Sequence, residues 1–133
     1  MITIEEQVKY WTNSAERDFE TMKVLLNSKR YPESLFFGHV VLEKMLKAFV
    51  TMETKEQPPK IHNLVVLEKL ANLNLSNDIK DYFVVVNTFN IRGRYDDYKE
   101  AFYKTCTKEY TEEHFRKVSE TYKNLCQLMK QKK

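Results

Sequence analysis

The sequence predicts an all-α protein, an up-and-down bundle of about five helices in one domain that covers residues 1–133. Three observations predict this class. Apolar residues recur at three- and four-residue spacings through most of the chain, which is the spacing of one face of an α-helix. Only two glycines and three prolines occur, which leaves little material for tight β-turns. Charged residues make up 31% and apolar residues 42% of the chain, the balance of a folded domain with one core.

Capping residues and prolines divide the chain into the predicted helices. Pro32 is tolerated in the first turn of a second helix, and Asn63 and Ser76 can cap a third and a fourth. We expect helices over residues 3–28, 32–54, 63–73 and 77–89, and a last helix from about residue 111 onward. The predicted core includes Leu35, Val40, Leu46, Phe83 and Leu125.

Composition excludes several classes of protein. The net charge of +3 is too small to indicate a nucleic-acid-binding protein by itself. Cys106 and Cys126 are too far apart for a zinc ribbon, and two sparse cysteines fit a reducing compartment. The chain starts without a secretion signal, and no apolar run approaches the roughly 20 residues that span a bilayer. We therefore expect a cytoplasmic protein that does not enter membranes.

The motifs of the common enzyme classes are missing as well. Two glycines cannot make a glycine-rich phosphate loop, and there is no G-x-S-x-G nucleophile motif. The three histidines are His39, His62 and His114, and none of them has the spacing of a helical zinc site. We expect no catalytic residues, no bound metal and no cofactor.

A first candidate site lies on the second predicted helix. His39, Glu43 and Lys47 follow one another at four-residue steps, so they share one face, and Glu43 can pair with either neighbour. This polar stripe has two interpretations. Either a carboxylate satisfies a buried histidine inside the protein, or the stripe forms a polar groove between subunits.

A second candidate site lies in the segment 90–110, which has no clean helical period. We expect it to be a long loop with a turn around Gly93, and long loops in compact domains are often functional. Guanidinium groups bind phosphate and tyrosine rings stack on bases, so this loop is a candidate nucleotide or RNA site. Alternatively, its aspartates neutralise its arginines and the loop only closes the bundle. The candidate ligand-binding residues here are Arg92, Arg94, Tyr95, Asp96 and Tyr98.

Three stretches together resemble the HEPN family. The stretch Phe36–Ala48, which ends in Glu-Lys-x-Leu-Lys-Ala, is similar to the second-helix signature of that family. The stretch Pro58–Leu64 is similar to its Pro-x-x-His-x-Leu motif before the third helix, and Asn90–Tyr98 to its Arg-Tyr-Pro-Asp loop, although Asp96 stands where proline is usual. The three motifs occur in the family's order and cover nearly the whole chain.

The resemblance implies a helical bundle that usually forms dimers. It also implies a role as a partner of a nucleotidyltransferase, as a toxin ribonuclease, or as a nucleotide- or RNA-binding module, and it adds His62 to the candidate site. The family's ribonucleases carry an arginine followed, after four to six residues, by a histidine. No such pair exists at the five arginines of this chain, which are Arg17, Arg30, Arg92, Arg94 and Arg116.

The leading hypothesis is therefore a non-catalytic HEPN-type module that binds a nucleotide, an RNA or a nucleotidyltransferase partner. Two alternatives are a metal-independent ribonuclease with a displaced active site and a purely structural dimerisation bundle. We also expect a homodimer, because the second helix carries more apolar surface than one small bundle readily covers.

Overall fold

The computed structural model describes residues 2–132 of the chain and shows six helices in this part. No β-strand occurs among these residues. The all-α fold class is confirmed, with one helix more than expected. The helices are α1 (Ile4–Asn27), α2 (Tyr31–Thr54), α3 (Leu64–Leu70), α4 (Asn77–Arg94), α5 (Asp96–Thr105) and α6 (Lys108–Lys132).

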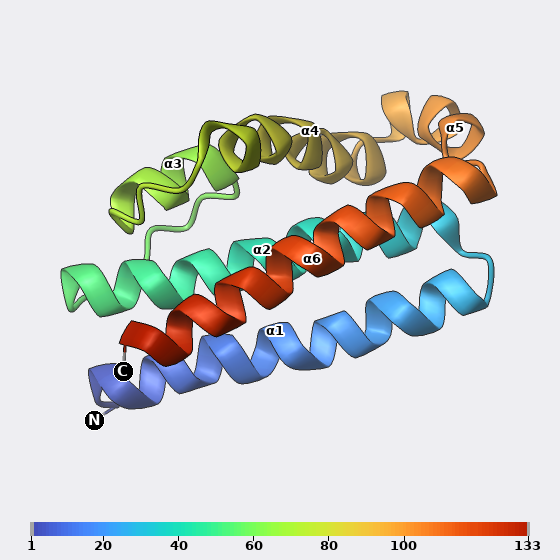
Figure 1. Ribbon diagram of the computed structural model, residues 1–133. Helices are drawn as coiled ribbons and strands as arrows, with labels where there is room; N and C mark the ends of the chain where they lie inside the picture. The colour runs from blue at the N-terminus through green and yellow to red at the C-terminus, as the bar shows by residue number, and fades with distance from the viewer. Residues whose placement is uncertain (1, 133) are drawn as a thin grey trace.

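Helix α2 is the centre of the bundle. It contacts each of the other five helices, and in Figure 1 it runs beside α1 and α6, with α3 and α4 along its other side. The reason lies in its composition, because apolar residues occur all round its circumference and such a helix must be enclosed. The start of α1 and the end of α6 lie at one end of the molecule, and α5 lies at the opposite end (Figure 1).

Local sequence explains the helix ends. Thr3 and Glu6 form a reciprocal capping box at the start of α1. Lys29, with a φ of 61°, makes the left-handed turn into α2, where Pro32 occupies the first turn. Asn63 caps α3 by accepting hydrogen bonds from two backbone amides. Ser76 caps α4 in the same way through the amide of Ile79.

Four of the five predicted core residues are buried, and one is not. Leu35, Leu46 and Phe83 are fully enclosed, as is nearly all of Leu125. Val40 is only half-buried, so that prediction was wrong, and the enclosed residue is its neighbour Val41. Successive residues in an α-helix are about 100° apart, so Val40 and Val41 face different directions.

Helix α3 is shorter than predicted. It ends at Leu70 rather than at Leu73. Asn72 and Asn74 both adopt left-handed backbone conformations, with φ of 54° and 56°, which a right-handed helix cannot contain. Asparagine tolerates this conformation better than most residues, so these two positions end the helix.

The long loop expected over residues 90–110 does not exist. Helix α4 continues to Arg94, α5 follows after the single residue Tyr95, and α6 begins at Lys108. Gly93 lies inside α4 and makes no turn with positive φ. Its role is close packing, because a Cβ atom at this position would lie 3.0 Å from Cδ1 of Phe36 on α2.

None of the six helices is long and apolar enough to cross a bilayer.

Candidate functional site

The structure separates the predicted site residues into two neighbouring groups. His39, Glu43, Lys47 and His62 form a compact set on α2 and the chain before α3, which we call the glutamate cluster. The residues Arg92–Tyr98 form the junction between α4 and α5, which we call the elbow. The two groups differ in burial.

Glu43 is the hub of the glutamate cluster. Its Oε2 atom accepts a hydrogen bond from Nζ of Lys47 at 2.8 Å, and lies 3.0 Å from Nδ1 of His62. Nδ1 of His39 lies 3.6 Å from the other carboxylate oxygen. His39, Glu43 and Lys47 are all buried, whereas the side chain of His62 is 47% exposed. One carboxylate thus gathers three nitrogen groups on one side of α2.

The protonation states in this cluster follow from burial and pairing. Burial raises the pKa of Glu43, but hydrogen bonds from Lys47 and His62 outweigh burial, so the net pKa is lowered and the carboxylate stays charged. Burial lowers the pKa of His39 more than its partners raise it, so this imidazole is neutral at pH 7. A neutral His39 donates from Nε2 to the backbone oxygen of His62 at 2.8 Å, and its Nδ1 atom then makes no hydrogen bond.

The cluster therefore holds the chain before α3 against α2. His62 is fixed twice, by its backbone oxygen on His39 and by its ring on Glu43. Lys47 is enclosed further by Trp11 of α1, whose ring centroid lies 5.5 Å from the ammonium group. The spacing of four residues predicted the set on α2, and the family resemblance alone predicted that His62 joins it.

At the elbow the two arginines have different environments. Nη2 of Arg92 donates to Oγ1 of Thr105 at 2.8 Å, and its guanidinium group covers the ring of Phe102 on α5. Arg94 is exposed and makes no ion pair or hydrogen bond through its side chain within the described residues. Its guanidinium group lies 5.8 Å from the ring centroid of Phe36. Arg92 is thus held by protein, and Arg94 is available to a ligand.

The other elbow residues also face water. Tyr95 and Tyr98 are 55% and 51% exposed. Asp96 pairs with Lys99 at 3.4 Å within the first turn of α5, and no ion pair joins it to either arginine. The structure therefore does not show the internal neutralisation of Arg92 and Arg94 that the sequence allowed as an alternative.

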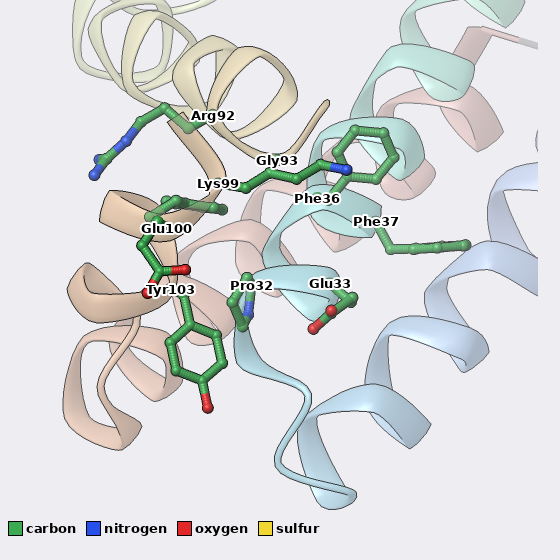
Figure 2. Close-up of a pocket in the computed structure, with 10 residues that line it drawn as sticks. Pro32, Glu33, Phe36, Phe37, Arg92, Gly93, Lys99, Glu100 and Tyr103 are labelled. Atoms are coloured by element: carbon green, nitrogen blue, oxygen red, sulfur yellow. The ribbon is translucent and has the colours of Figure 1, made fainter. Parts of the chain in front are cut away.

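A pocket of about 360 Å³ opens beside the elbow, between the first turns of α2, the end of α4 and one face of α5 (Figure 2). Its volume lies within the range of about 300–1,000 Å³ that is usual for small-molecule sites. Aromatic side chains from α2 and α5 form part of its walls, and it carries charges of both signs. The charged lining residues are Glu33, Arg92, Lys99 and Glu100.

Sequence analysis missed the α5 residues of this pocket, namely Lys99, Glu100 and Tyr103. They were missed because the segment was expected to be irregular, so its side chains had no predicted face. The sequence did contain one indication of this helix, in its charges. Asp96 and Asp97 stand in the first turn of α5 and Lys104 in the last, a charge distribution that suits a helix dipole.

Phe36 connects the elbow with the glutamate cluster. It lines the pocket, lies beneath Arg94, and stands three residues before His39 on the same helix. The positive charge of Arg94 also contributes to the lowered pKa of His39, after the larger effect of burial. Phe36 and Arg94 therefore place the elbow next to the His39 end of the glutamate cluster.

His114 lies away from both groups. Its Nδ1 atom shares a hydrogen bond of 2.8 Å with the hydroxyl of Tyr82, and the two rings are stacked. Burial lowers the pKa of His114. No set of three or more His, Cys, Asp or Glu side chains in the described range is arranged to hold a metal ion.

The family model of the HEPN domain matches residues 8–132. This chain belongs to the HEPN family. Searches of curated proteins and of solved structures gave no match. In this HEPN domain the three motifs converge, because the second-helix motif lies in α2, the Pro-x-x-His-x-Leu motif runs into α3, and the Arg-Tyr motif forms the elbow.

Proposed function

We propose that this HEPN domain is a non-catalytic module that binds a nucleotide or a short single-stranded RNA at the elbow and its pocket. The observation that carries the proposal is Arg94, an exposed guanidinium group with no side-chain hydrogen bond or ion pair within the described residues. It lies 5.8 Å from the ring centroid of Phe36, which lines the aromatic-walled pocket. An arginine fork can hold two phosphate oxygens at once. Tyr95 and Tyr98 are exposed enough for a base to stack on them.

The charges in the pocket support the same ligand class. Arg92 and Lys99 both line it and give it positive charge, although Arg92 is hydrogen-bonded to Thr105 and Lys99 is paired with Asp96. Lys99 reaches across from α5 toward Phe36 in Figure 2. Aromatic rings beside cationic groups are the usual means of binding single-stranded nucleic acid without a catalytic step.

The absence of the family's Arg/His pair supports a non-catalytic role. RNA cleavage without a metal needs a base for the 2′-hydroxyl and a cation for the developing phosphorane charge. His39 and His114 are buried and hydrogen-bonded. His62 is half exposed, and its contact with Glu43 through Nδ1 leaves Nε2 open, so it is the one histidine that could act as a base. No arginine stands four to six residues before it to complete the family's pair. We expect RNA to stay intact when incubated with the protein, and cleavage that is lost in His62→Ala would overturn this part of the proposal.

A titration tests the binding proposal. Mononucleotides and short single-stranded RNA are titrated at two salt concentrations, and binding that depends on phosphate weakens as salt rises. Arg94→Ala should weaken binding about tenfold, since one charge-assisted hydrogen bond contributes about 1.5–3 kcal/mol. Arg17→Ala is the matched control, because Arg17 is also exposed but lies on α1.

Each negative result has a definite meaning. If Arg94→Ala binds as well as the parent, the elbow is not the site. If the parent protein binds no nucleotide and no RNA at millimolar concentration, the proposal fails. A nucleotidyltransferase partner or a purely structural role then replaces it.

The homodimer also remains a proposal, on altered grounds. The other helices bury most of the apolar surface of α2, so that surface no longer supports a dimer. Exposed apolar residues lie instead on α3 and α4, namely Val66, Leu70, Val84, Val85 and Ile91. A clean monomer by light scattering at tens of micromolar would contradict the dimer, since moderate self-association has a Kd near the micromolar range.

A further inference from the structure

Two carboxylates that line the elbow pocket have no side-chain partner within the described residues. Glu33 belongs to the first turn of α2 and Glu100 to α5, and both line the pocket. Neither makes an ion pair or a side-chain hydrogen bond within the described residues, whereas Asp96 close by is paired with Lys99. Both side chains are exposed to water, and a carboxylate can only accept hydrogen bonds, so this pocket favours a ligand that offers donors as well as phosphate.

The position of Glu100 indicates which kind of hydrogen-bond donor the ligand would present. Glu100 and Tyr103 are three residues apart on α5, and therefore lie on the same face of that helix. Figure 2 shows both side chains extending from α5 in the same direction. Tyr103 is 70% exposed, so its ring is open to stacking. A base stacked on Tyr103 would present its edge to the neighbouring carboxylate.

Among the common bases, guanine matches a carboxylate best. Its N1–H and its 2-amino group are two adjacent donors, so both carboxylate oxygens can accept at once. Adenine and cytosine each place a ring acceptor beside their amino group, and that lone pair repels a carboxylate. Uracil flanks its one N–H with two carbonyl oxygens. Arg92 and Lys99 also line the pocket and supply positive charge for the phosphate of such a nucleotide, although Lys99 already pairs with Asp96.

We infer that the elbow pocket selects guanine nucleotides, with Glu100 accepting from N1–H and the 2-amino group and with Tyr103 stacking on the base. This inference rests on the proposed nucleotide- or RNA-binding function and adds the identity of the base. A bidentate contact discriminates by about 1–3 kcal/mol, and at an open pocket we expect the lower end, about fivefold to tenfold in affinity.

The test compares five ligands by calorimetric titration: guanosine, inosine, adenosine, cytidine and uridine 5′-monophosphates. Inosine monophosphate differs from guanosine monophosphate only in lacking the 2-amino group. The expected order places guanosine monophosphate first, about fivefold or more tighter than inosine monophosphate. Equal affinity for all five would overturn the inference and leave the proposed function standing. Absence of all binding would overturn the proposed function as well.

Three variants then assign the contact. Glu100→Gln should bring the affinity ratio of guanosine to inosine monophosphate close to one, because an amide presents one acceptor and one donor to the base. Glu53→Gln is the control, since Glu53 is exposed on α2, twenty residues or about 30 Å from Glu33. A preference that survives in Glu100→Gln but is lost in Glu33→Gln would overturn the assignment to Glu100. Thermal unfolding of each variant, followed by circular dichroism, shows whether it is folded.

Discussion

The glutamate cluster and the elbow both contain acidic and basic side chains, but the charges of the first are buried and most of those of the second are exposed. In the cluster, the charges of Glu43 and Lys47 are buried and satisfied by each other. At the elbow, Arg94 is exposed and has no side-chain partner within the described residues. A charge that is already paired inside the protein contributes to the fold, and a charge without a partner is free to bind a ligand. Under the proposed function, the cluster serves stability and the elbow serves binding.

The largest expected effect comes from removing the hub of the cluster. Glu43→Ala leaves the Lys47 ammonium group buried without its carboxylate, and it frees His62. Breaking a buried pair from one side costs about 3 kcal/mol or more in the free energy of unfolding. The measurement is urea unfolding followed by circular dichroism.

Glu120→Ala is the control for that variant. Glu120 pairs with Arg116 at 3.0 Å on the surface of α6, where both side chains are more than half exposed. Such pairs contribute only about 0.5 kcal/mol. If Glu43→Ala lowers the free energy of unfolding no more than Glu120→Ala does, the cluster does not stabilise the fold. The contrast drawn between the cluster and the elbow would then be wrong.

A second, smaller effect should appear with pH. The pKa of His39 is lowered by burial, so the unfolded chain takes up this proton first as pH falls through the ordinary histidine pKa of 6.5, and stability decreases there. The lowered pKa of Glu43 stabilises the fold above the ordinary glutamate pKa of 4.5, and this contribution is lost as pH falls further. The free energy of unfolding should therefore decrease in two stages below pH 7.

Urea unfolding at about pH 7.5, 5.5 and 3.5 brackets the two ordinary pKa values. In His39→Gln the first stage should shrink but not vanish, because burial also lowers the pKa of His114. A first stage of unchanged size in this variant would show that His39 is not buried in the neutral form.

The smallest effect distinguishes the two arginines of the elbow. Arg92→Ala removes a hydrogen bond to Thr105 and the contact with Phe102, so it should cost about 1 kcal/mol of stability. Arg94→Ala should change stability by less than about 0.5 kcal/mol, as for other exposed residues. Thermal or urea unfolding of both variants measures this difference. Equal losses would mean that Arg94 is held by the protein and is not reserved for a ligand.

The sequence predicted well the features that depend on regular helical spacing, and poorly those that depend on burial and side-chain packing. The four-residue spacing of His39, Glu43 and Lys47 placed them on one face, but it could not decide which neighbour Glu43 would bind. The structure shows the closer contact with Lys47, at 2.8 Å, whereas His39, which burial leaves neutral, lies 3.6 Å from the carboxylate. That choice depends on desolvation, which spacing does not reveal.

Gly93 shows that a contact between distant parts of the chain can also defeat a prediction from local sequence. A glycine between two arginines predicted a turn, yet Gly93 is helical, and the structure gives another reason for glycine here: the ring of Phe36 lies where a Cβ atom would need space. This contact joins residues more than fifty positions apart, so no local pattern could predict it. With the turn placed wrongly, α5 was missed, and Glu100 and Tyr103 were missed with it.

The single-residue link at Tyr95 has a consequence for motion. Phe102 is the one fully enclosed side chain of α5, and Thr105 bonds to Arg92. An element with so little buried surface opens locally at low free energy, well below the cost of global unfolding. The backbone amides of α5 should therefore exchange with deuterium faster than those of α2. A nucleotide bound between α5 and α2 would slow that exchange. The rate of amide exchange in α5 would then measure how much of the pocket is occupied by ligand.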